Sequence, residues 1–219
     1  MRRFLGRRRT WPDGFGLLHV YLVPDLDRDR DLARLVDDCG RIMSGYDFIP
    51  PMAPHWIHAT VAPVMGVPSA TVDAAVRAEF ASRLRAALSG VPAFTLTAGS
   101  PLAGASTVAL DLDGDLPGQP LHTVYTLTRK VIGELFGPGA LEYEAMPGHL
   151  TLAYASGAGD SGDVQSALRT RVRPSHAPMT VGEVHVVDVV QHRDPVTYYS
   201  WTVIDRIPLR APERAIIGG

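Results

Sequence analysis

Two short motifs with the pattern His-x-Thr-apolar carry the side chains best suited to catalysis. They read His58-Ala59-Thr60-Val61 and His149-Leu150-Thr151-Leu152. Residues two apart in a β-strand point to the same face, so each histidine is expected to project together with its threonine. The apolar residues of each motif would then point the other way, into a core.

These residue types fit acid–base chemistry on a phosphate ester. Histidine has an unperturbed pKa of about 6.5, so it can accept or donate a proton near neutral pH. A pair held in opposite protonation states supplies the base that activates a nucleophile and the acid that protonates the leaving oxygen. Each threonine hydroxyl can donate a hydrogen bond to a non-bridging phosphate oxygen. Opening of a 2′,3′-cyclic phosphate needs this set of groups.

The elements that position the two motifs occur twice in the same order. Strand, helix, Pro/Gly loop and a His-x-Thr strand follow one another, with 38 residues from Val20 to His58 and 41 from Val108 to His149. The pattern predicts an α+β fold with a pseudo-twofold duplication: two lobes, each an antiparallel or mixed sheet with outer helices, around a central cleft. Hydrophobic periodicity predicts strands at 17–23, 56–61, 94–97, 107–112, 149–154, 180–190 and 198–207, and helices at 32–43, 72–88, 121–135 and 164–170.

Length, composition and charge constrain the class of protein and its domain organisation. The chain has 219 residues, 46% of them hydrophobic, and a formal net charge of −2, so no overall basic field for long duplex nucleic acid is expected. We expect a single bilobal domain over residues 14–219, preceded by a basic, flexible tail over residues 1–13. The single cysteine, Cys39, excludes an intramolecular disulfide and is expected to be a small buried residue. No apolar run reaches membrane-spanning length, and we expect a cytoplasmic monomer.

The two motifs also bear a family resemblance. Paired His-x-Thr-apolar motifs 91 residues apart, each after a loop that contains proline, resemble those of the 2H phosphoesterase superfamily, which includes 2′-5′ RNA ligase-like proteins and cyclic phosphodiesterases. The resemblance implies a bilobal fold with His58 and His149 as catalytic residues and Thr60 and Thr151 as phosphate-binding residues. It assigns His149 as the base and His58 as the acid in hydrolysis, with the roles reversed for ligation. It also implies a possible substrate contact at Tyr154.

Other residues offer alternatives to this interpretation. His55, His58 and His149 could form a three-histidine zinc site, but strand parity places His55 on the opposite face or in the preceding loop, so we expect no metal and no cofactor. His19 alternates with Tyr21 and is a weaker candidate for the floor of the cleft.

The remaining candidate side chains are expected to be structural. We expect His185 to pack within a strand. A solvated strand face explains Asp111 and Asp113 better than a catalytic carboxylate pair does. The following residues are expected at the surface or in core packing: His122, His176 and His192 at the surface, and Tyr198, Tyr199 and Trp201 in the core rather than stacked on a base.

Together these observations predict a metal-independent phosphoesterase. It would hydrolyse, or reversibly ligate, a phosphodiester at a ribose 2′-oxygen, such as a 2′,3′-cyclic phosphate or a 2′-5′ linkage. Its partner would be a small nucleotide or an RNA end, since the residues after the second motif, 153–156, are uncharged and disfavour long RNA. Two alternatives remain: a non-catalytic module that binds a nucleotide or RNA end in the same cleft, and an unrelated metal-dependent hydrolase.

Overall fold

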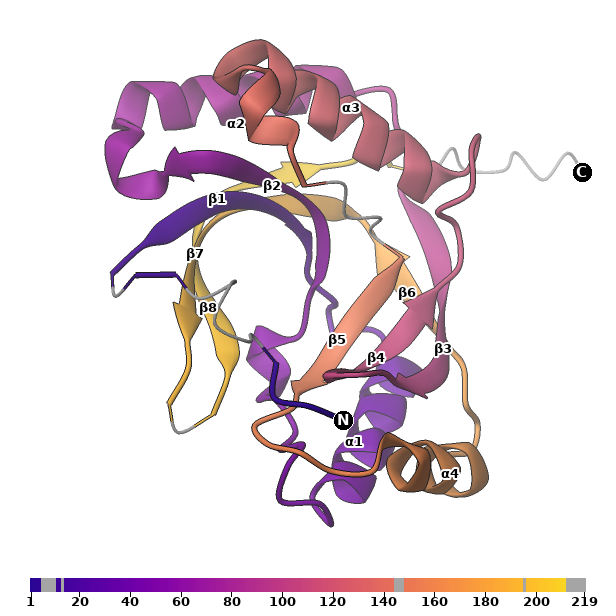
Figure 1. Cartoon of the computed structure of the whole chain (residues 1–219). Helices are drawn as coiled ribbons and strands as arrows, with labels where there is room; N and C mark the ends of the chain where they lie inside the picture. The colour runs from indigo at the N-terminus through magenta and orange to yellow at the C-terminus, as the bar shows by residue number, and fades with distance from the viewer. Residues whose placement is uncertain (5–10, 13, 144–147, 195, 212–219) are drawn as a thin grey trace, which may run out of the picture.

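The strands of this protein form two separate antiparallel sheets. A computed structural model of the chain describes residues 1–4, 11–12, 14–143, 148–194 and 196–211, and Figure 1 shows it whole. The first sheet, which is strongly curled, runs in the order β2 (Ala59–Pro68), β1 (Gly16–Leu22), β7 (Glu183–His192) and β8 (Tyr198–Pro208). The second runs in the order β5 (His149–Tyr154), β4 (Thr107–Leu112), β3 (Phe94–Ala103) and β6 (Ala177–Val181). All neighbouring strands are antiparallel.

Helices cover one face of each sheet. Their bounds are α1 (Arg30–Met43), α2 (Ala74–Leu88), α3 (Pro120–Phe136) and α4 (Ser161–Arg171), with short 3-10 turns η1 (Pro54–Trp56), η2 (Ser69–Thr71) and η3 (Pro138–Leu141). Asp73 caps the N-terminus of α2, and its carboxylate accepts a hydrogen bond from the Val76 amide at 2.8 Å. Gly137 caps the C-terminus of α3, and its φ of +86° is a conformation that favours glycine.

The duplication predicted from the sequence is present, and its two units are interlocked. The units β1-α1-β2 and β4-α3-β5 place β2 and β5 at equivalent sheet edges, each beside the first strand of its unit. The helix α1 packs on β5 and β6 of the second sheet, whereas α3 packs on β2 of the first. Figure 1 shows α2 and α3 over the first sheet and α1 and α4 against the second. The predicted α+β fold with two lobes is therefore confirmed, with each unit's helix supporting the other unit's sheet.

Each sheet has a second face, away from its helices, which we call the helix-free face. Alternate residues such as Val20 and Leu22 pack into one large core cluster with Phe80 and Leu150. The intervening Tyr21 belongs instead to a small separate cluster with Val187 and Val189, flanked by aromatic rings. This small cluster lies on the helix-free face of the first sheet, on the side opposite the main core.

The predicted bounds of the strand over 56–61 were wrong at both ends. The segment predicted as a strand over 56–61 begins as the turn η1, and β2 starts only at Ala59, one residue after His58. The strand then continues through Pro63 instead of ending there. Since β2 is the edge strand of its sheet, a residue without an amide proton is tolerated within it.

The strand predicted over 180–190 is two strands in different sheets. The chain leaves β6 of the second sheet at Val181 and enters β7 of the first sheet at Glu183. Gly182 makes this crossing, and its carbonyl accepts a hydrogen bond from the Leu209 amide at 2.8 Å. A valine-rich segment is predicted as one strand because periodicity carries no information about which sheet a residue joins.

The start of the chain contacts the loops beside β5. The Arg2 amide donates to the Ala105 carbonyl at 2.8 Å, and the Phe4 amide donates to the Ala155 carbonyl at 2.9 Å. Most of the predicted basic tail, residues 5–10 and 13, lies outside the described residues. Cys39 is fully buried, and burial raises the pKa of its thiol to about 12, which fits the predicted structural role. None of the helices in the described ranges is long and apolar enough to cross a membrane.

Candidate active site

The first motif histidine is held between the turn η1 and the start of β2. His58 is only 3% exposed, and its Nδ1 lies 2.9 Å from the Trp56 carbonyl oxygen. A carbonyl can only accept, so Nδ1 carries the proton and Nε2 is left with a free lone pair when the ring is neutral. The ring stacks on Tyr21, with centroids 4.1 Å apart, and meets the edge of Trp201 at 5.0 Å. The orientation of this imidazole is therefore fixed from three sides.

The surroundings of His58 favour its neutral form. Burial lowers its pKa to about 4, although the hydrogen bond to the Trp56 carbonyl acts in the opposite direction. A positive charge on His149 would lower it further, which indicates that the two rings lie close enough to influence each other. Near neutral pH this residue is a base with an available Nε2.

The second motif histidine has a different environment. His149 is the first residue of β5 and is exposed, opposite Asp111 of β4 in the antiparallel register. Loss of solvent around part of the ring lowers its pKa, whereas the Asp111 carboxylate raises it. Asp111 itself is exposed, as predicted, but the register gives it a neighbour that the sequence pattern did not indicate.

The backbones of the two motifs meet directly. His58 and Thr151 form an isolated antiparallel bridge, in which the Thr151 amide donates to the His58 carbonyl at 3.3 Å. Residues opposite each other in an antiparallel pair project to the same face, so these two side chains lie next to each other. His149 lies close enough to His58 for their charges to interact, and Thr60 is hydrogen-bonded to Tyr21, the ring that stacks on His58. The two motifs, which come from two sheets, therefore lie beside each other.

Each motif is followed by a β-bulge at the same position. In β2 the register steps from Tyr21–Thr60 to Val20–Ala62, and in β5 it steps from Ala109–Thr151 to Val108–Ala153. Strict alternation would place residues three apart on opposite faces of the sheet. The extra residue of the bulge shifts this alternation, so residues three apart across the bulge lie on the same face. Tyr154 consequently shares the face of Thr151, as its register partner Thr107 shares that of Ala109. Tyr154, the candidate substrate contact, therefore lies on the same face of the sheet as Thr151.

Both motif threonines have a tyrosine as hydrogen-bond partner. Thr60 is bonded to Tyr21, and Thr151 to Tyr154. Burial raises the pKa of both phenols, so both tyrosines stay protonated near neutral pH. A neutral phenol can accept from the threonine or donate to it, so each pair can turn a hydroxyl proton toward an anion.

Sequence reasoning missed the aromatic surroundings of His58. Trp201 and Tyr199, predicted to pack in the core, lie with the small cluster on the helix-free face of the first sheet. The ring centroid of Trp201 also lies 5.3 Å from that of Tyr21, so His58, Tyr21 and Trp201 contact one another. Tyr198 stacks on His192 instead, at 4.4 Å. The alternation of β8 could have indicated a shared face for residues 199 and 201, but not which face is the core.

The other histidines have the following places. His19 is buried on the helix-free face beside Tyr21, which matches the weaker prediction of a place near the site. His185 is buried and bonded to Glu183 at 2.8 Å, and His192 is half-buried and bonded to Ser200. His122 is half-buried on α3 and His176 is exposed.

The alternative zinc site is not assembled. His55 lies in η1 and is exposed, and its ring contacts that of Trp56 with the centroids 4.7 Å apart. Among the described residues, no group of three or more His, Cys, Asp or Glu side chains is arranged to hold a metal ion. The three-histidine arrangement considered from the sequence is therefore not supported.

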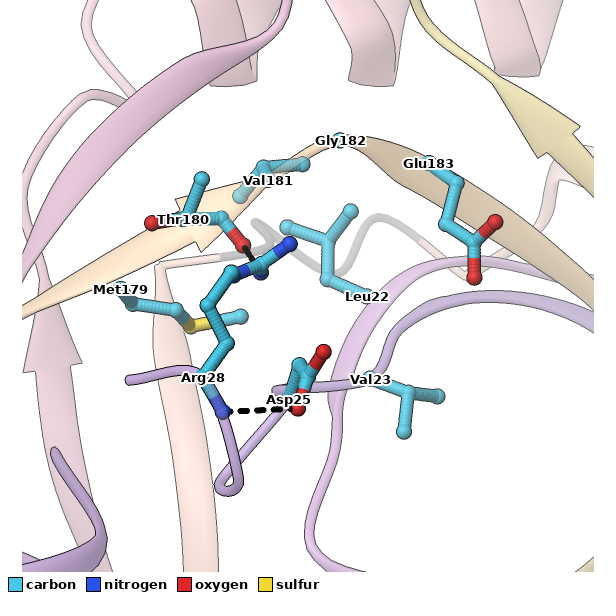
Figure 2. Close-up of a pocket in the computed structure, with 9 residues that line it drawn as sticks. All are labelled: Leu22, Val23, Asp25, Arg28, Met179, Thr180, Val181, Gly182 and Glu183. Carbon is cyan, nitrogen blue, oxygen red and sulfur yellow. Dashed lines mark hydrogen bonds between the residues drawn. The ribbon is translucent and has the colours of Figure 1, made fainter. Parts of the chain in front are cut away.

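A pocket of about 250 Å³ lies elsewhere, where the chain crosses from β6 to β7. Figure 2 shows its lining, which includes Asp25, Arg28 and Glu183 but no motif residue. The Arg28 guanidinium donates to the Thr180 carbonyl at 2.8 Å, and the Arg28 amide donates to the Asp25 carboxylate at 3.0 Å. These bonds tie the loop after β1 to β6, which is a structural role.

Comparison with solved structures matches the fold over most of the chain. The protein TT0787 of Thermus thermophilus superposes with a TM-score of 0.66 at 14% identity, over 89% of this chain and 98% of that one. A structure described as a phosphoesterase gives a TM-score of 0.59 at 15% identity, with the same shares covered. Escherichia coli LigT complexed with 3′-AMP gives 0.57 at 15% identity, also over 89% of this chain and 98% of LigT. A comparison with protein-family models and curated sequences finds no match. The resemblance predicted from the motifs is thus confirmed at the level of the fold.

Proposed function

We propose that this chain is a metal-independent two-histidine phosphoesterase. It hydrolyses, or reversibly forms, a phosphodiester at a ribose 2′-oxygen, such as a 2′,3′-cyclic phosphate or a 2′-5′ linkage in a small nucleotide or RNA end. The observation that carries the proposal is the bridge between His58 and Thr151, which brings two His-x-Thr motifs from equivalent sheet edges into one site. Two acid–base groups and two hydroxyl donors are what in-line attack on a phosphodiester requires.

The environments of the two histidines favour a division of roles opposite to that implied by the family resemblance. His58 is neutral near pH 7, and its Nε2 is free, because Nδ1 donates to the Trp56 carbonyl. Burial of part of the ring lowers the pKa of His149 as well, but the Asp111 carboxylate opposes that shift, so His149 is the more easily protonated of the two histidines. We assign His58 as the base that activates water or a ribose hydroxyl, and His149 as the acid that protonates the leaving oxygen.

Similarity to solved structures supports the substrate class. LigT, which shares this fold, has been solved in complex with 3′-AMP and with ATP. The aromatic rings around His58 offer faces on which a nucleobase can stack. A nucleoside phosphate thus fits both the polar and the aromatic parts of the site.

The test is hydrolysis of the four nucleoside 2′,3′-cyclic monophosphates in EDTA. The parent protein is compared with the His58→Ala/His149→Ala double variant and with His176→Ala, which alters an exposed histidine. We expect product with the parent and with His176→Ala, and none with the double variant. Turnover that EDTA abolishes, or that survives in the double variant, would refute the proposal. Nucleotide binding without turnover would favour the non-catalytic binding module.

A further inference from the structure

His19 is a buried histidine without a hydrogen-bond partner. Its side chain is 8% exposed, and neither Nδ1 nor Nε2 has a partner among the described residues. It lies on β1 two residues before Tyr21, and its ring meets that of Tyr21 edge-on at 5.2 Å. Since Tyr21 in turn stacks on His58, His19 is separated from the first motif histidine by a single ring.

Retention of an unpaired polar ring is costly to the fold. A buried donor or acceptor that has lost its water partners destabilises the folded state unless it is paired. The duplicated framework does not require a histidine here, because the second unit has Thr107 at the equivalent register position, opposite Tyr154, where His19 lies opposite Pro63. Features that violate packing rules in this way are concentrated at functional sites.

The surroundings of His19 are aromatic and include one ring from outside the sheets. Trp11 lies 6.1 Å from His19 and 5.8 Å from Tyr199, and its amide donates to the Gln191 side chain at 2.9 Å. Trp11 precedes β1 and belongs to no strand, so it is the ring that can leave without disturbing a sheet. Its removal would open a space bordered by aromatic rings with one imidazole edge inside it.

We propose that His19 recognises the polar edge of the nucleobase, and that the base takes the place of the Trp11 ring over it. This inference rests on the proposed function, because it assumes that the phosphate of the same nucleotide lies at His58 and His149. A flat heterocycle with donors and acceptors on its edge is the ligand class that an aromatic space with one polar ring selects.

The protonation state of His19 suits this role. Burial, aided by the nearby His58, lowers its pKa to about 3, so the ring is neutral at physiological pH. A neutral imidazole has one nitrogen that donates and one that accepts. Nucleobase edges present both kinds of group, so His19 can pair with a base without placing a charge in this buried position.

The experiment measures equilibrium binding, so that it does not depend on turnover. Isothermal titration calorimetry gives Kd values for the four nucleoside 3′-monophosphates and for ribose 5-phosphate, which has no base. The proteins are the parent, His19→Leu, Trp11→Ala and the exposed control His176→Leu. In His19→Leu we expect the Kd of the best nucleotide to rise about five- to tenfold, the effect of one lost hydrogen bond. The Kd of ribose 5-phosphate and the control should not change, and the Tm of His19→Leu should equal or exceed that of the parent.

The remaining outcomes test the separate parts of the proposal. Equal nucleotide Kd values in the parent and His19→Leu, or no nucleotide binding by the parent, would overturn it. A lower Tm together with equal losses for nucleotide and ribose 5-phosphate would show that His19 is structural. Trp11→Ala should bind the nucleotide as tightly as the parent or more tightly, and weaker binding would overturn replacement of its ring. His19-dependent binding without hydrolysis of any cyclic phosphate would support this inference while the proposed reaction fails.

Discussion

The two halves of this molecule use the same backbone for their motifs but give the two histidines different surroundings. In the first half, His58 is 3% exposed, stacked on Tyr21 and bonded through Nδ1 to a carbonyl. In the second half, His149 is exposed and faces the carboxylate of Asp111. Even the bulge after the threonine recurs in both halves, so the difference lies in the neighbours and not in the motif.

This difference shows how a duplicated site can acquire two distinct chemical roles. Burial disfavours the charged form of His58 and lowers its pKa to about 4. Partial burial lowers the pKa of His149 too, but the neighbouring Asp111 carboxylate opposes that shift and keeps His149 easier to protonate than His58. Two titratable groups of one type become acid and base when their environments move their pKa values apart. The pseudo-twofold frame supplies equal positions, and the side chains around each position supply the asymmetry.

Removal of either histidine should have the largest effect. We expect His58→Ala and His149→Ala each to lower kcat at least about 100-fold, the low end for general acid–base catalysis. Initial rates on 2′,3′-cyclic nucleotides measure this, with circular dichroism to confirm the fold and His176→Ala as the control. A variant that keeps parent activity would take its histidine out of the mechanism, and the comparison of the two halves would no longer concern catalysis.

The threonines should matter less than the histidines. Thr60→Val and Thr151→Val keep the shape of the side chain but remove a donor to a negatively charged phosphate oxygen. A hydrogen bond to a charged group contributes enough for a loss of about tenfold in kcat/KM. Steady-state kinetics of both variants test this, with Thr126→Val on the exposed surface of α3 as the control. Parent kinetics in both variants would mean that the phosphate is held by other groups.

The pH dependence of kcat/KM should show the asymmetry directly. Activity requires neutral His58 and protonated His149, so the rate should rise through a pKa of about 4 and fall through a pKa below 6.5. The Asp111 carboxylate raises the pKa of His149, so Asp111→Asn should move the falling limb to lower pH and cost a few-fold in rate near pH 6.

A control for this profile is available on the same segment. Asp113 is an exposed carboxylate that follows β4, and it is not the register partner of His149. Asp113→Asn should leave the falling limb in place. A limb that moves equally in both variants would mean that general surface charge, and not the carboxylate opposite His149, supports the protonated form.

The parts of the fold that could be predicted from the sequence are those that hydrophobic periodicity encodes. Alternation within 149–154 and 107–112 gave strands with the observed bounds, because both strands bury one face in the core. The order strand, helix, loop, strand revealed the duplication. Periodicity could not show that α1 and α3 cross to the opposite sheet, since a helix buries the same stripe against either.

The site was predictable only in its four motif residues. The pairing of His149 with Asp111 depends on register, and the place of Tyr154 depends on a bulge that strict alternation does not contain. The rings of Tyr21 and Trp201 approach His58 from strands far apart in the chain, β1 and β8. A single sequence contains no signal for these contacts, because each depends on how two distant segments are aligned.

The smallest expected effect concerns stability, namely how the free energy of unfolding of the parent and of His19→Leu depends on pH. In the unfolded chain each histidine takes up a proton near pH 6.5, whereas the folded chain keeps His19 and His58 neutral down to about pH 3 and 4. Below pH 6.5 the unfolded state therefore binds more protons, and the free energy of unfolding falls as the pH falls. The slope is about 1.4 kcal/mol per pH unit for each such histidine. Urea unfolding at pH 7, 6, 5 and 4.5 should show a slope that is shallower in His19→Leu by about one histidine's share, and unchanged in His176→Leu. Equal slopes in the parent and His19→Leu would mean that His19 is not held neutral by the fold, and the contrast between a buried and an exposed half of the site would rest on His58 alone.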